Sequence, residues 1–201
     1  MRTRSVAIAG ALLAGVAVLA GCDRLAHPTA NDPSSSAPPA PAGAGDFERA
    51  PSPSPSPTPA RAAGGTCTLL DYASVARATG TQFEVAAASS SSGAKTCALQ
   101  VLYSDYPDLV LSVVGTEADA KAFTAAAPDD SSSVSGLGSA AYSRVLAAGN
   151  GAGPAVEVAW LGKHKQIVTL RYTYPKDVGA HTASDHVGAL TRYARSIEAR
   201  R

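Results

Sequence analysis

The chain has 201 residues and a formal net charge of +1 at pH 7, from 17 basic and 16 acidic side chains. Without Arg2 and Arg4, which precede an apolar run at the N-terminus, 15 basic residues face 16 acidic ones. A charge so close to zero argues against a nucleic-acid-binding surface and against a polybasic membrane patch.

Residues 1–21 have the layout of an export signal. The basic segment precedes Val6–Ala20, an apolar run too short for a comfortable membrane span, which takes about 20 apolar residues. Leu19-Ala20-Gly21-Cys22 resembles the lipobox, in which small residues precede a cysteine that takes a diacylglyceryl group. This resemblance implies cleavage before Cys22 and lipid anchoring to the extracytoplasmic face of the cell membrane. The alternative is an ordinary secretory peptide in which Cys22 is incidental.

We interpret residues 22–65 as a disordered tether. They hold ten of the fourteen prolines, and Pro51–Pro59 alternates proline strictly with Ser or Thr. Apart from Leu25 and Phe47, the segment has no large apolar side chain, so it cannot offset its ordering entropy. We expect a spacer with polyproline-II character. Docking to a proline-binding module and O-glycosylation of its hydroxyls are the alternatives.

If Cys22 carries a lipid, Cys67 and Cys97 are the cysteines that remain. An exported domain faces an oxidising space, so we predict a Cys67–Cys97 disulfide, worth roughly 3–4 kcal/mol in the chain-entropy model. Two free thiols or a metal pair are the alternatives, but a metal site needs further ligands at suitable spacing. No metal and no cofactor is expected.

Residues 66–201 are expected to form one globular domain. Three helices are predicted, each starting with a Thr N-cap and an Asp three residues on, at residues 69–79, 116–128 and 183–199. Alternating apolar residues predict six strands, near residues 82–86, 96–104, 108–114, 140–147, 155–161 and 165–174. Turns are predicted at 104–108, 149–154 and 162–165, and a loop at 89–93.

These elements follow the order α-βββ-α-βββ-α. They predict an α+β fold, with an antiparallel sheet of five or six strands and helices packed on one face. The repeated Thr-x-x-Asp helix starts allow two interpretations, an internal duplication of an αβββ unit or three independent N-caps.

Several motifs carry a family resemblance: the lipobox, the Ser/Pro tether, Cys67-Thr-Leu-Leu70, Cys97-Ala-Leu99 and Gly136–Ala141. With them the chain resembles small actinobacterial exported lipoproteins that are related in pattern to extracellular sensor domains of mycobacterial receptor kinases. The resemblance implies a non-enzymatic envelope protein and transfers no catalytic residue.

Candidate site residues are few. His181 and His186 are five apart, a poor spacing for metal ligands on one helix face, and no nucleophile-elbow motif accompanies them. We therefore assign no catalytic and no metal-binding residue. The one positive hypothesis is a groove for an apolar ligand or a sugar. Its aromatic lining residues, all predicted on strands, are Tyr103, Tyr142, Trp160, Tyr172 and Tyr174.

The anchor, the spacer and the absence of a catalytic motif favour a non-enzymatic module that binds or senses an envelope component or a partner protein. Two alternatives stay open: an envelope hydrolase using His181 or His186 with a nearby Ser and Asp, and a passive structural or accessory lipoprotein. The expected partners are the membrane, through the lipid, and the envelope ligand or protein. No nucleic acid is expected.

Overall fold

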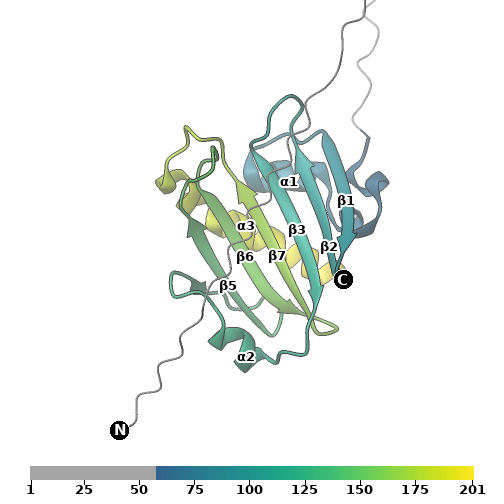
Figure 1. Cartoon of the computed structure of the whole chain (residues 1–201), viewed down its shortest axis with the longest axis vertical. Helices are drawn as coiled ribbons and strands as arrows, with labels where there is room; N and C mark the ends of the chain where they lie inside the picture. Colours follow the sequence, from purple (N-terminus) through teal and green to yellow (C-terminus); the bar gives the residue numbers. More distant parts are fainter. Residues whose placement is uncertain (1–57) are drawn as a thin grey trace, which may run out of the picture. The chain divides into compact units, whose positions relative to one another are not determined.

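The computed structural model describes residues 58–201, so the predicted signal, Cys22 and most of the tether lie outside the described residues. This part of the chain forms an α+β domain on one antiparallel sheet (Figure 1). The strands are β1 (Val85–Ser91), β2 (Ala94–Gln100), β3 (Asp108–Gly115), β4 (Ser132–Ser133), β5 (Ala140–Leu146), β6 (Ala155–Gly162) and β7 (Gln166–Thr173). The helices are α1 (Tyr72–Thr79), α2 (Ala120–Ala125) and α3 (Ala180–Arg200), preceded by the 3₁₀ turns η1 (Ala60–Ala63) and η2 (Gly65–Leu69).

The seven strands follow the order β1-β2-β3-β7-β6-β5-β4, and all neighbouring pairs are antiparallel. The α+β class and the antiparallel sheet are confirmed, but the expected five or six strands and the expected element order are wrong. The added strand is β4, two residues of a Ser-rich segment that pair with β5. β1 also differs, because it runs to Ser91 through serines that were expected to form a loop. Each of these serines pairs with a residue of β2.

At two helix starts the N-cap is an aspartate and not the predicted threonine. Asp71 caps α1 and accepts a hydrogen bond from the Ser74 backbone N–H at 2.9 Å. Asp119 caps α2 in the same way, through the Ala122 N–H at 2.7 Å. Aspartate is a stronger N-cap than threonine, so both α1 and α2 begin at the aspartate of their Thr-x-x-Asp sequences and not at the threonine.

Two three-stranded meanders, β1–β3 and β5–β7, meet where β3 pairs with β7. This strand arrangement is what a duplicated unit would give, but the helices do not repeat. α1 and α3 lie behind the sheet in Figure 1, whereas Phe123 of α2 packs on the opposite face with Ala159 and Leu161. The expectation that the helices cover one face is therefore wrong for α2. In α3 the expected cap, Thr182, lies inside the helix, which has no side-chain N-cap.

The face covered by α1 and α3 forms the main core. Strand side chains alternate between the two faces, and on this face they are the apolar set that the sequence predicts. Fully buried examples from the three central strands are Leu109, Leu111, Val156, Val158, Trp160, Val168 and Leu170. Ala194 and Ile197 of α3 pack against them.

Cys67 and Cys97 form the predicted disulfide, which joins η2 to β2 with the Cα atoms 5.0 Å apart. Both residues are fully buried. Ala60 of η1 is 2% exposed and belongs to the same core. The folded domain therefore begins before residue 66, within the segment that the sequence assigns to the tether, because the small side chain of Ala60 is packed.

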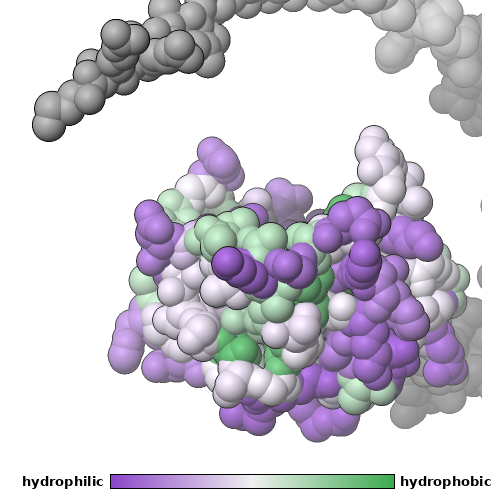
Figure 2. Space-filling model, turned by 90° about the horizontal axis from the view of Figure 1, so that it is seen from below, coloured by the Kyte–Doolittle hydropathy of each residue, from purple (hydrophilic) through white to green (hydrophobic). Residues whose placement is uncertain are grey.

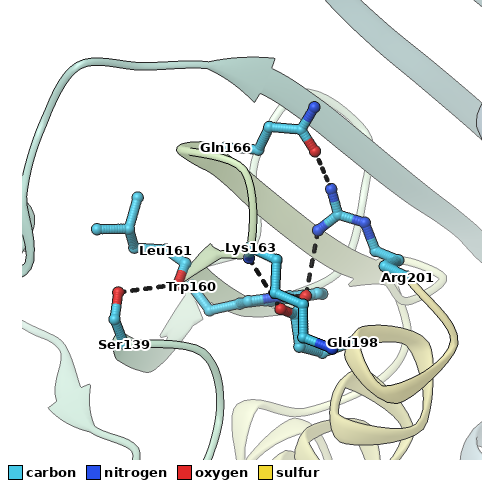
Figure 3. A network of polar contacts seen from close by, with 7 residues as sticks. All are labelled: Ser139, Trp160, Leu161, Lys163, Gln166, Glu198 and Arg201. Carbon is cyan, nitrogen blue, oxygen red and sulfur yellow. Dashed lines mark hydrogen bonds and ion pairs between the residues drawn. The ribbon is translucent and has the colours of Figure 1, made fainter.

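A polar network joins the end of α3 to the hairpin between β6 and β7 (Figure 3). Glu198 accepts hydrogen bonds from the Trp160 indole N–H at 2.9 Å and from the Lys163 backbone N–H at 3.0 Å. It also forms an ion pair with Arg201 at 3.2 Å, and Arg201 donates to Gln166 of β7. The network therefore fixes the last turn of α3 against the sheet.

Candidate functional site

The sheet face opposite α1 and α3 carries polar side chains near its centre. Three charged residues lie side by side on adjacent strands: Arg144 on β5, Glu157 on β6 and Arg171 on β7. The register places Glu157 directly opposite both arginines. Directly opposed residues have Cβ atoms about 4.5–5.5 Å apart, so the three side chains form a row of alternating charge.

The two arginines of this row differ in their partners. Arg144 Nε donates to Glu157 Oε1 at 2.8 Å, and Glu157 is only 8% exposed, so this ion pair is largely shielded from water. Asp130 lies 3.7 Å from the same guanidinium. Arg171 is exposed and makes no ion pair with another of residues 58–201. Its guanidinium is therefore available to a ligand.

The row borders a hollow of about 450 Å³, which we call the polar hollow. Its volume falls within the range of about 300–1,000 Å³ typical of small-molecule sites. The sheet forms its floor, and the loop between β5 and β6 contributes to its lining. The charged and polar side chains that line it are Asp108, Asn150, Glu157, Thr169, Arg171 and Thr173.

Asp108, at the start of β3, is the carboxylate of the polar hollow with a perturbed pKa. Burial raises its pKa above the ordinary value of 3.8, and a hydrogen bond with Thr173 and the charge of Arg171 offset that shift only in part. Asp108 Oδ1 is shielded from solvent and has no hydrogen-bond partner among the described residues. A buried acceptor without a partner costs about 1–3 kcal/mol, so the fold holds Asp108 at the polar hollow at a cost to stability.

Backbone contacts hold the wall of the polar hollow in place. Asn150 and Gly151 form the turn predicted at 149–154, and Asn150 adopts a φ of 53°, which asparagine tolerates. The Gly153 N–H donates to the Tyr174 carbonyl at 2.9 Å. A Cβ at Gly153 would overlap the Pro175 carbonyl, so only glycine lets the wall lie against the end of β7.

The five predicted groove residues are distributed over different surfaces. Tyr142 lies on the open face, where its ring stacks on Phe123 with the ring centroids 5.7 Å apart. Tyr103 is fully exposed in the turn after β2. The other three are buried in the core beneath the helices: Trp160, Tyr172 and Tyr174. The structure therefore does not bring the five side chains together on one surface.

The histidines considered for catalysis have other partners. His186 Nδ1 is hydrogen-bonded to the hydroxyl of Tyr174, on which its ring stacks. Burial raises the pKa of Tyr174 strongly, so this hydroxyl stays protonated. His181 is exposed, with Nε2 3.9 Å from the Asp185 carboxylate. Among residues 58–201 neither imidazole is hydrogen-bonded to a serine, so this geometry gives a Ser–His–Asp triad no support.

Two other hollows are weaker candidates. One of about 260 Å³ lies beside Phe123 and Tyr142 and contains one carboxylate and no basic group. α2 lies at the lower end of the domain, and seen from below this end has apolar residues grouped near its middle, with polar ones around them (Figure 2). A hollow of about 550 Å³ near η1 is larger, but its Asp71 caps α1 and its Arg200 donates to a backbone carbonyl.

Alternation along β6 and β7 places Glu157 and Arg171 on the face opposite the apolar core residues, where Arg171 is exposed and Glu157 is buried. It gives no register between strands, so it does not bring Asp108 or Arg144 to the same surface. Within residues 58–201, no group of three or more His, Cys, Asp or Glu side chains is arranged to hold a metal ion. In the same range, no helix is both long enough and apolar enough to span a membrane. Compared with known protein families, curated proteins and solved structures, the chain matches none of them.

Proposed function

We propose that the protein is a lipid-anchored envelope module that binds a polar ligand in the polar hollow and catalyses no reaction. The observation that carries this proposal is the exposed guanidinium of Arg171 beside the partly buried carboxylate of Asp108. These groups place fixed hydrogen-bond donors and acceptors within one concave surface. A concave surface with a few convergent polar groups is the usual form of a binding site.

The predicted anchor and tether suit such a role. A lipid on Cys22 holds the protein at the outer face of the membrane, and a proline-rich spacer lets the domain reach material of the cell envelope. The resemblance to extracellular sensor domains points in the same direction. In this proposal the membrane is a partner through the lipid alone, and nucleic acid is not a partner.

Asp108 favours binding over a passive structural role. If this surface bound no ligand, the shielded and unpaired Oδ1 of Asp108 would bring the protein no advantage. Such a group costs folding free energy, and a neutral side chain at the same position would remove that cost. A ligand that donates to the accessible part of the Asp108 carboxylate offsets part of this cost.

A site-specific photocrosslinker tests the proposal in cells that export the full-length protein. p-Benzoylphenylalanine replaces Ser112, which lines the polar hollow, or Ser184, which is exposed on α3 outside it. Light-dependent adducts are expected from position 112, fewer of them when Arg171 is also changed to alanine, and none from position 184. Equal adducts at both positions, or no adduct at position 112, would contradict the proposal.

A further inference from the structure

We infer that the ligand of the polar hollow is a neutral carbohydrate, one or two sugar units of an envelope glycan; this inference rests on the proposed function. Three features of the hollow carry it: the balance of its charges, the kinds of hydrogen-bonding group that line it, and the apolar surface beside them.

Three charged side chains line the polar hollow: Asp108, Glu157 and Arg171. Arg144 and Glu157 neutralise each other through their ion pair. Arg171 lies opposite Glu157 on the neighbouring strand and diagonal to Asp108, which begins the strand on its other side. Because Glu157 is already paired with Arg144, an anionic ligand would still approach the carboxylate of Asp108, and a cationic ligand would approach the guanidinium of Arg171. A neutral ligand meets neither repulsion.

Sugar hydroxyls match the lining groups, because each hydroxyl both donates and accepts a hydrogen bond. Arg171 offers N–H donors, the carboxylate of Asp108 offers an acceptor, and the Thr169 hydroxyl can act as either. Planar charged side chains fix the direction of these bonds. An apolar ligand would shield the same groups from water and leave them unpaired, which would weaken its binding.

Apolar surface lies next to these polar groups. Tyr106 and Val110 also line the hollow, and both are half-buried, so part of each side chain faces it. The C–H faces of a sugar ring pack on such surface while its hydroxyls reach the polar groups. A volume of about 450 Å³ suits a mono- or disaccharide. The open sheet face leaves room for a longer glycan to continue beyond the hollow.

Saturation-transfer NMR on the full-length lipidated protein in detergent micelles tests this inference. The probes are three neutral disaccharides, N,N′-diacetylchitobiose, maltose and trehalose, with glucuronate and inorganic phosphate as charged competitors. We expect transfer to at least one disaccharide, unchanged by equimolar competitor. Arg171→Ala and Asp108→Asn should each weaken binding about tenfold or more. Arg192→Ala, on an exposed position of α3, is the matched control and should bind as the parent does.

Any other result of these experiments overturns the carbohydrate inference, and each result identifies a different reason. Displacement of the sugar by phosphate or glucuronate through Arg171 would identify an anion site. Sugar binding that Arg171→Ala and Asp108→Asn leave unchanged would place the sugar elsewhere. If no disaccharide binds but the crosslinker at Ser112 still captures a component, the carbohydrate inference falls and the proposed function stands. If the crosslinker also captures nothing, both fall.

Discussion

Replacing Glu198 with alanine is expected to lower the free energy of unfolding by about 3 kcal/mol. Glu198 is 8% exposed and accepts hydrogen bonds from the Trp160 indole and the Lys163 backbone. Trp160 is fully buried, so its N–H finds no water when the carboxylate is removed, at a cost of about 1–3 kcal/mol. Lys163 lies in an exposed turn and regains water more easily. The lost ion pair with Arg201, itself shielded, supplies the remainder.

Two matched variants separate these contributions. Glu198→Gln keeps an oxygen that can accept from Trp160 but removes the charge that pairs with Arg201, so an intermediate loss of about 1–2 kcal/mol is expected. Trp160→Phe removes the donor itself. The double variant Trp160→Phe with Glu198→Ala should therefore lose less than the sum of the two single losses, by about 1 kcal/mol or more.

Equilibrium urea unfolding followed by far-ultraviolet circular dichroism measures these differences without relying on the single tryptophan. With a urea dependence of about 2 kcal/mol/M, the Glu198→Ala midpoint should fall by about 1.5 M. A fall of less than about 0.5 M with an unchanged slope would refute the argument that the network fixes α3 to the sheet. Additive losses in the double variant would show that the indole and the carboxylate do not depend on each other.

Changes elsewhere in the chain have equally definite outcomes. Cys22→Ala should remove the lipid mass from the mature N-terminus and shift the protein out of the membrane fraction; an unchanged distribution would contradict the lipobox interpretation. Changing Cys67 and Cys97 together to alanine should cost roughly 3–4 kcal/mol in urea unfolding, and reduction of the parent protein should destabilise it by a similar amount. The raised pKa of Asp108 means that the folded state holds this proton more tightly than the unfolded state does. The protonated Asp108 carboxyl therefore stabilises the folded state fully below its ordinary pKa of 3.8. This stabilisation is lost as the pH rises through the folded-state pKa. Relative to the parent, Asp108→Asn should then be more stable near neutral pH than in acid, and a difference that does not vary with pH would contradict this.

The strands that the sequence predicts best are those with uninterrupted apolar alternation. Residues 108–114, 155–161 and 165–174 correspond closely to β3, β6 and β7, because every second residue of each is apolar and buried on the core face. β1 lacks that pattern. Its Ala and Ser residues are mostly exposed, and the strand exists because its backbone pairs with β2 residue by residue. Its length is set by the partner strand and not by its own side chains.

The candidate site depends on pairings that no local pattern encodes. Hairpins between consecutive strands bring Arg144, Glu157 and Arg171 into one row, and the turn lengths fix that register. Asp108 joins them through the pairing of β3 with β7, strands that are distant in the chain. The aromatic groove failed to assemble for a related reason: alternation separates the two faces of a strand but does not say which face the helices cover.

The stabilising contacts and the polar hollow lie on different sides of the sheet, which decides how the site can be tested. The disulfide, the packed apolar residues and Glu198 belong to the side of α1 and α3, while Arg171 and Asp108 face the open side. Glu157 is the exception. Its removal would leave Arg144 as a shielded charge without its closest partner, an effect of about 3–5 kcal/mol in a fully buried pair and less for this partly exposed one. Glu157 is therefore better placed to balance charge beneath the hollow than to contact a ligand. Asp108 also affects stability, so the exposed Arg171 is the residue whose substitution best isolates binding from folding.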